Sequence, residues 1–338
     1  MIKVLSLFDG LAGARQALKE LNIDCEYYAS EIDKYAIQVA KKQHPEIVHI
    51  GDVKEIFYYP LGSYNWLSWK NKDFGFTFTK ANKINLLIGG SPCQDLSIAK
   101  KDRKGLSGER SGLFYEYLRI LKEIKPKYFI LENVASMSKE AKDLISKELF
   151  DINPIMINSS LLTAQQKKRF YWVGKLQENG TYKKTEIKQP EDKGVLLKDI
   201  IEDGIAPNKK SGCLTATYYK CSGLRDYLIG GRQVVAKSIK IGQLNKGGQG
   251  DRIYSVNGKS VCLSANGGGR GAKTGLYKID LPDGDYIVRK LTPNECARLQ
   301  GFPDNYHEGV SNTQAYKCYG NSFTVPIIKH ILQHFNEL

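Results

Sequence analysis

Residues 86–94 read LLIGGSPCQ: a short apolar run, two glycines, a serine-proline pair and a lone cysteine. The apolar run predicts a buried strand, and Pro92 stiffens the turn after it by fixing φ and biasing Ser91 towards extended geometry. Cys93 therefore stands beyond the carboxyl end of a strand, where open α/β sheets bind their ligands. An isolated cysteine is more often an inert core residue than a nucleophile, so its assignment depends on the rest of the chain.

Strand and helix signals alternate on both sides of this stretch. Apolar residues at helical spacing mark 11–21 and 33–42, and Asp33 is placed to cap the second of these helices. Short apolar runs predict strands at 3–8, 27–30, 47–50, 85–89, 128–131, 155–158 and 169–173. This alternation predicts an α/β protein with a doubly wound, mostly parallel sheet.

The alternation returns near residue 287. Thr292, Pro293 and Glu295 form a helix-start pattern, with a cap, a proline at the first position and an acid that reaches back. Residues 323–335 place Val325, Ile328, Ile331, Leu332 and Phe335 on one stripe, which predicts a core helix.

Residues 176–286 have a different texture. Helical periodicity fades there, and glycine and lysine accumulate between short β-type runs, as in KGGQG at 246–250. A chain of 338 residues also exceeds the usual size of one domain. We therefore predict one domain built from 1–175 plus 287–338, and a smaller β-rich domain over 176–286.

Charge and cysteine usage narrow the class of protein. The chain has 50 basic and 36 acidic residues, a net charge of +14, which weakly favours a polyanionic partner. Its seven cysteines are scattered and form no CxxC pair, which argues for a reducing compartment and against a structural metal site. Because the sequence shows no signal peptide and no membrane-spanning run, we expect a soluble cytoplasmic protein without bound metal.

The first glycine loop, FDGLAG at 8–13, lies between a predicted strand and a predicted helix. It matches neither the dinucleotide-binding fingerprint nor the P-loop, so a different ligand is expected if the loop binds one. Glu31 and Asp52 follow the second and third predicted strands, and a carboxylate after such a strand can accept from ribose hydroxyls. The plain alternative is a tight turn and two helix caps.

Two short motifs carry a resemblance to a known family. Pro92-Cys93-Gln94, followed by Glu132-Asn133-Val134 after the next buried run, resembles the DNA cytosine-C5 methyltransferases. The resemblance implies the fold of S-adenosylmethionine-dependent methyltransferases, with a smaller target-recognition domain over 176–286. It also implies that Cys93 attacks the target base and that Glu132 holds the N3 edge of that base.

Further motifs extend the resemblance. Residues 163–169, TAQQKKR, resemble the family's Gln-x-Arg-x-Arg segment, with Arg169 at the position that contacts the base's O2. Lys167 stands where the first arginine is usual, and lysine keeps the charge but loses the bidentate fork. The resemblance further implies S-adenosyl-L-methionine as cofactor, held by Phe8, Asp9, Gly10, Gly13, Glu31, Ile32, Asp52, Val53, Pro92, Asn321 and Ser322.

Basic residues next to Cys93 and in the 176–286 region are candidates for DNA contact. Residues 95–110 form a basic, glycine-bearing loop beside the candidate nucleophile, typical of a lid that meets phosphate, although most charge runs are solvated surface. The candidates are Gln94, Lys100, Lys101, Arg103, Lys104, Arg225, Arg232, Arg252 and Arg270.

Residues 58–83 depart from the family, which usually connects the flanking strands briefly. The segment is rich in aromatic and lysine residues, and we expect a hairpin over the sheet edge with a packing role.

The sequence as a whole predicts a monomeric enzyme that makes 5-methylcytosine in a specific sequence of double-stranded DNA. A cytosine in a duplex must be flipped out to reach such a site. Two alternatives stay open: a tRNA cytosine-C5 methyltransferase, which the large 176–286 region disfavours, and a catalytically inactive DNA-binding relative, which the presence of Cys93 and Glu132 disfavours.

Overall fold

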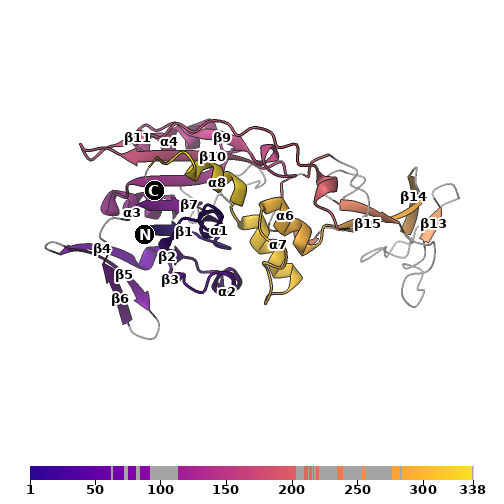
Figure 1. The fold of residues 1–338 in the computed structure, drawn as a ribbon, viewed down its shortest axis with the longest axis horizontal. Helices are drawn as coiled ribbons and strands as arrows, with labels where there is room; N and C mark the ends of the chain where they lie inside the picture. The colour runs from indigo at the N-terminus through magenta and orange to yellow at the C-terminus, as the bar shows by residue number, and fades with distance from the viewer. Residues whose placement is uncertain are drawn as a thin grey trace.

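The protein is described from a computed structural model, drawn as a ribbon in Figure 1. The structure describes residues 1–61, 64–71, 75–80, 84–91, 113–202, 209–211, 213–214, 216, 218–220, 234–238, 253–255, 276–281, 284–336 and 338.

An eight-stranded sheet forms the centre of the fold. Its strand order is β11-β10-β8-β7-β1-β2-β3, and β9 pairs with β10. Its strands are β1 (Ile2–Leu7), β2 (Cys25–Ser30), β3 (Val48–Gly51), β7 (Leu86–Gly89), β8 (Tyr128–Val134), β9 (Ile155–Asn158), β10 (Lys168–Leu176) and β11 (Tyr182–Lys184). The ladders from β8 to β3 are parallel, whereas β10 runs antiparallel to each of its neighbours. The predicted α/β class and mostly parallel sheet are confirmed.

Helices cover both faces of this sheet. They are α1 (Gly13–Glu20), α2 (Lys34–Gln43), α3 (Leu113–Ile124), α4 (Lys139–Glu148), α6 (Pro293–Gln300), α7 (Asn312–Asn321) and α8 (Val325–Leu332). Buried residues of α1, α2, α6, α7 and α8 join Val4 of β1 in one hydrophobic cluster, and those of α3 and α4 join Leu5 and Leu7 in a second. Because successive side chains of a strand point to opposite faces, a strand buried on both sides is a continuous apolar run.

Local signals placed several element boundaries correctly. Asp33 caps α2 by accepting from the Tyr35 amide, and Thr292 and Glu295 form the reciprocal capping box of α6. The first predicted helix begins two residues late, at Gly13, because Ala12 adopts a left-handed φ of 58° and ends the preceding loop. The last helix covers only Val325–Leu332, and its predicted apolar stripe is buried.

The aromatic insertion forms more than a hairpin. Strands β4 (Ile56–Leu61), β5 (Tyr64–Asn71) and β6 (Gly75–Lys80) make a three-stranded antiparallel sheet beside β3. Trp69 of β5 is buried and meets the Tyr28 ring of β2 edge-on, with 6.4 Å between centroids. The expected packing role fits these contacts.

A second, four-stranded sheet lies in the range 176–290. Its order is β12 (Val234–Ser238), β15 (Gly284–Lys290), β14 (Leu276–Leu281) and β13 (Ile253–Ser255). In Figure 1 the labelled strands β13, β14 and β15 lie far from the central sheet, and β15 leads directly into α6. By contrast β11, early in this range, pairs with β10. The exact boundary between the two predicted domains stays a prediction.

Residues that precede the second sheet in the chain are hydrogen-bonded to α6 and to Leu291, which lies just before this helix. The buried Glu295 carboxylate accepts from the Glu202 amide at 2.8 Å, and Arg298 donates to the Ile200 carbonyl at 2.9 Å. Tyr218 accepts a hydrogen bond from the Leu291 amide at 2.8 Å. The described part of the chain contains no helix long and apolar enough to cross a membrane.

Candidate active site

A cavity of about 270 Å³ opens at the carboxyl ends of the parallel strands. Phe8, Glu31, Asp52 and Gly90 directly follow β1, β2, β3 and β7, and Glu132 lies near the end of β8. The cavity brings together eleven of the predicted site residues: Phe8, Gly10, Glu31, Ile32, Asp52, Val53, Glu132, Lys167, Arg169, Asn321 and Ser322. The edge of the sheet therefore joins the predicted donor-binding residues to the predicted base-binding residues.

Two predicted cofactor residues lie outside the cavity lining. The Asp9 side chain is buried, with 2% of its surface exposed, and Gly13 packs at the start of α1. A Cβ atom on Gly13 would lie 3.2 Å from the Cβ of Phe323, so glycine permits α1 to approach the start of α8 closely. Gly13 thus affects the glycine loop only indirectly, by allowing this close packing of the helix that follows it.

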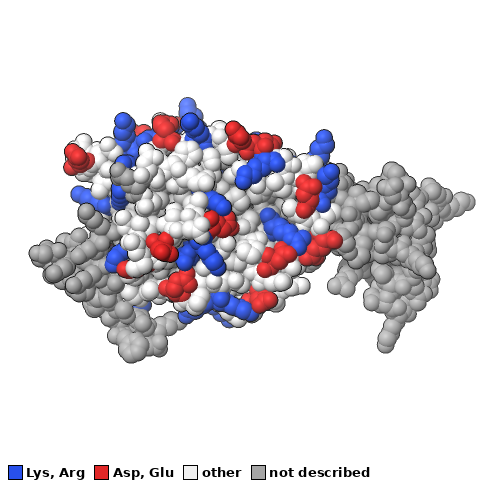
Figure 2. Space-filling view, in the orientation of Figure 1, with Lys and Arg blue, Asp and Glu red and all other residues white. Residues whose placement is uncertain are grey.

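The remaining predicted residues lie outside the described part of the chain. These are Pro92, Cys93, Gln94, Lys100, Lys101, Arg103, Lys104, Arg225, Arg232, Arg252 and Arg270. Their roles remain predictions. On the face drawn in Figure 2, basic and acidic side chains are interspersed over the described body, with no single basic patch.

The glycine loop has an unusual backbone. Phe8, Gly10 and Ala12 have φ values of 57°, 60° and 58°, a left-handed conformation that costs non-glycine residues about 1 kcal/mol each. Glu31 stabilises this loop, because its carboxylate accepts from the amide of Gly10 at 2.8 Å and from those of Ile32 and Asp33. One acid therefore fixes the ends of β1 and β2 to each other.

The part of the cavity beside Ile32 is open and partly apolar. Ile32 lines it with 72% of its surface exposed, which is unusual for a large apolar side chain and leaves a face for a flat ring. Asp52 caps the short helix that begins at Val53 by accepting from the Lys54 amide at 3.0 Å.

Glu132 and Arg169 form the polar centre of the other half. The Arg169 Nε lies 2.9 Å from a Glu132 carboxylate oxygen, and both side chains are largely buried. The antiparallel register explains the pairing: Tyr171 lies opposite Glu132 and Arg169 opposite Val134, so the two charges are diagonal neighbours on one face. Burial and the nearby Glu132 charge raise the pKa of Tyr171 well above its usual value.

Gly90 makes room for this ion pair. A Cβ atom there would lie 3.0 Å from the Glu132 Oε2 and 3.0 Å from the Phe323 ring. Any side chain at this position would have to displace the carboxylate or the ring.

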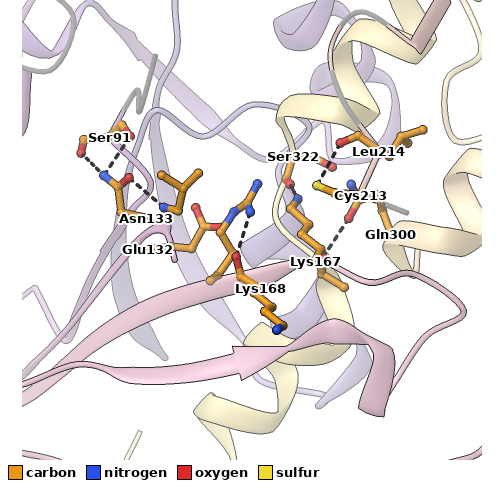
Figure 3. A network of polar contacts seen from close by, with 12 residues as sticks. Ser91, Glu132, Asn133, Lys167, Lys168, Cys213, Leu214, Gln300 and Ser322 are labelled. Atoms are coloured by element: carbon orange, nitrogen blue, oxygen red, sulfur yellow. Dashed lines mark hydrogen bonds and ion pairs between the residues drawn. The ribbon is translucent and has the colours of Figure 1, made fainter. Parts of the chain in front are cut away.

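Asn133 connects the ends of β7 and β8, as Figure 3 shows. Its Nδ2 donates to the Ser91 hydroxyl at 3.2 Å and its Oδ1 accepts from the Val134 amide at 2.8 Å, and both Asn133 and Ser91 are buried. Asn133 thereby fixes Ser91, the residue that precedes Pro92 and Cys93 in the sequence.

Lys167 connects the part of the cavity around Glu132 and Arg169 to the part formed by Ser322. Its Nζ donates to the Ser322 carbonyl at 2.7 Å, and only 3% of its surface is exposed (Figure 3). A single ammonium donor suffices for this contact, so the lysine can brace the cavity wall without the fork of an arginine.

Several residues of the site were not identified from the sequence. Ser30, Gly90, Ser91, Leu113 and Gly320 line the cavity, and all but Leu113 stand beside a motif or strand end already singled out. Gln165, which opens the Gln-x-Arg-x-Arg-like segment, is fully buried, donating to the Leu299 carbonyl and accepting from the Leu214 amide. A glutamine beginning a charged motif was the available signal for it.

Comparisons with known proteins agree with this fold. The solved structure of the Entamoeba histolytica methyltransferase EhMeth superposes with a TM-score of 0.61 at 17% identity and covers 99% of this chain and 97% of its own. The S. pombe Dnmt2 methyltransferase gives a TM-score of 0.57 at 18% identity, covering 98% of this chain and 97% of its own. These likenesses establish the methyltransferase fold.

Sequence relatives share nearly the full length. The Type II methyltransferase M.HhaI of Haemophilus parahaemolyticus is 28% identical over 98% of this chain and 93% of its own. The Type II methyltransferase M.HpaII of Haemophilus parainfluenzae is 30% identical over 99% of this chain and 90% of its own. The model of the C-5 cytosine-specific DNA methylase family matches residues 2–337, so it is to this family of DNA-methylating enzymes that the chain belongs.

Proposed function

We propose that the enzyme flips a cytosine out of duplex DNA into this cavity, adds the Cys93 thiolate to C6 and methylates C5 with S-adenosyl-L-methionine. The observation that carries the proposal is that one cavity holds the Glu132–Arg169 pair beside the loop fixed by Glu31. Phe8, Ile32 and Asp52 offer apolar and acidic contacts suited to the adenosine part of the donor.

The chemistry needs a nucleophile and a group at N3. Attack of the Cys93 thiolate on C6 forms a C–S bond and moves ring electrons towards N3, where the Glu132 carboxyl hydrogen bonds or gives a proton. The ring is then an enamine, and the donor would supply a methyl group for C5, its positively charged sulfur keeping the electrons of the broken S–CH3 bond and leaving as a neutral thioether. A base removes the C5 proton, the C5–C6 double bond re-forms, and the thiolate leaves.

The described residues prepare this reaction by holding positions. Arg169 keeps the Glu132 carboxylate in place, Asn133 fixes the entry to the Cys93 turn, and Lys167 ties this wall to Ser322. Such preorganisation lowers the cost of bringing the reacting atoms into line.

The two predicted domains have different roles in this proposal. We assign catalysis to 1–175 plus 287–338 and target recognition to 176–286, with residues 95–110 as a lid that contacts phosphate. A cavity that holds one base cannot read the neighbouring bases, and a sheet set apart from the catalytic body suits that task. We expect the protein to act as a monomer.

The test is a methylation map. Bisulfite sequencing of DNA from cells that express the protein should show unconverted cytosines within one short sequence, and cells that express Cys93→Ser should show none. Replacing residues 176–286 with the region of a related enzyme of known specificity should move methylation to that enzyme's sequence. Methylation of tRNA instead of DNA would overturn the proposal, and an active chimera that keeps the original sequence would overturn the domain assignment.

Glu31→Ala should weaken S-adenosyl-L-methionine binding by about 1.5–3 kcal/mol, the range for hydrogen bonds to a charged group. The variant loses the proposed ribose contact and also the acceptor of the Gly10 amide. Titration calorimetry with the donor measures the effect. Glu31→Gln keeps one acceptor oxygen, so its affinity for the donor should lie between those of the wild type and Glu31→Ala. An unchanged affinity would reduce Glu31 to an anchor of the loop.

A further inference from the structure

Asp9 lies behind the donor-binding loop rather than in it. Its neighbours Phe8 and Gly10 line the cavity, while its own side chain points into the core and is almost completely buried. The left-handed φ values of Phe8 and Gly10 produce this arrangement, because they turn the chain sharply on either side of Asp9.

The carboxyl group of Asp9 is only partly satisfied. Its Oδ1 accepts from the Ser6 hydroxyl of β1 at 2.5 Å and from the Tyr27 hydroxyl of β2 at 2.6 Å. Its Oδ2 is buried and has no hydrogen-bond partner among the described residues. An amide oxygen could accept the same two hydroxyl groups, so these contacts alone do not require an acid.

Ionising this group is costly in its surroundings. Burial and, to a smaller extent, the nearby Glu31 carboxylate raise the pKa of Asp9 to about 6, although hydrogen bonds from the Ser6 and Tyr27 hydroxyls lower it in part. Tyr306 also faces the cluster, and the Asp9 charge contributes to the raised pKa of its hydroxyl. Asp9 is therefore negatively charged at neutral pH in a buried position where a neutral side chain would avoid the free-energy cost of desolvating a charge.

We propose that the Asp9 carboxylate lets the enzyme distinguish the methyl donor from its product by charge. The inference rests on the proposed function, in which the donor sulfur is a positively charged sulfonium and the product sulfur a neutral thioether. A negative charge behind the loop stabilises the bound donor and gives the product nothing comparable. The interior has a low dielectric, so the attraction persists across the thickness of one loop.

The test compares the two ligands across pH. Dissociation constants of S-adenosylmethionine and S-adenosylhomocysteine are measured by calorimetry from about pH 5 to about pH 7.5, around the raised pKa. In the wild type, the preference for the donor should rise about tenfold as pH increases through this range, because Asp9 is neutral below its pKa and charged above it. In Asp9→Asn the preference should be flat and low.

A second variant tests the same charge without removing it. Tyr27→Phe deletes a hydroxyl that donates to the ionised carboxylate, so the midpoint of the pH profile should move upward. Tyr28→Phe is the matched control, because the Tyr28 hydroxyl donates to Glu26 instead, and its midpoint should stay.

The outcomes separate the two proposals. A wild-type preference that does not change with pH, or equal weakening of both ligands in Asp9→Asn, would overturn the charge inference. Failure of the wild type to bind either ligand at any pH would contradict the proposed function itself. If Asp9→Asn fails to fold, the pH profile of Tyr27→Phe decides between the outcomes. A profile with the same midpoint as the wild type would overturn the inference.

Discussion

Cys93→Ser is expected to abolish methyl transfer, with a rate loss on the order of 10⁴-fold or more, the size seen when a covalent nucleophile is removed. A serine hydroxyl is far less nucleophilic than a thiolate and has no adjacent base arranged for it in this proposal. DNA affinity should change little, because contacts to phosphate and to neighbouring bases do not involve the sulfur. Rates are measured by transfer of a labelled methyl group, and affinity by gel mobility shift.

Covalent trapping makes this result specific. DNA that carries 5-fluorocytosine at the target should form a stable adduct with the wild type, because fluorine at C5 cannot leave as a proton does. Cys93→Ser should form none, whereas Cys25→Ser, which alters a partly buried cysteine at the start of β2 and outside the cavity lining, should trap normally. Trapping by the Cys93 variant would place the nucleophile elsewhere.

Glu132→Gln is expected to lower the methylation rate by about 10²- to 10⁴-fold, the usual contribution of a positioned general acid or base. Glutamine keeps the size of the side chain and one acceptor for Arg169, but it cannot give a proton to N3. Donor affinity should stay close to the wild type, since Glu132 contacts the base half of the cavity in this proposal. Single-turnover methylation and calorimetry measure the two quantities.

A matched control tests whether the loss of any ion pair, rather than of the Glu132 carboxyl group, lowers the methylation rate. Lys42 of α2 and Glu308 form an exposed pair with 2.8 Å between the charged atoms, and Glu308→Gln should leave the rate unchanged. If Glu132→Gln methylates as fast as the wild type, the carboxyl group has no part at N3 and another residue must bear the developing charge.

The sequence predicted those features that depend on neighbouring residues or on strand ends. The Asp33 cap and the capping box of Thr292 and Glu295 are local, so three or four residues suffice to specify them. The sequence predicts that Phe8, Glu31 and Asp52 lie close together, because the carboxyl ends of parallel strands share one edge of a sheet.

Features that depend on packing between distant segments were not predictable in the same way. Lys167 and Ser322 are 155 positions apart, and nothing local to either residue indicates their contact. Asp9 stands in the glycine loop like its neighbours, and the left-handed backbone at Phe8 and Gly10, which directs its side chain into the core, is not visible in the sequence. The aromatic residues of 58–83 indicated a β-hairpin. The three-stranded sheet that forms instead, and the contact of Trp69 with Tyr28, depend on packing against the edge of the central sheet at β3.

The part of the cavity proposed to hold the donor is built from residues far apart in the sequence, with Phe8 and Gly10 from one segment and Gly320, Asn321 and Ser322 from another. During synthesis the first of these residues leave the ribosome long before the last, and domains fold as their segments become available. If the proposed donor site is correct, nascent or prematurely terminated chains that lack residues 320–322 have no complete site for the methyl donor. We therefore expect this methyltransferase to stay inactive until these residues have been translated.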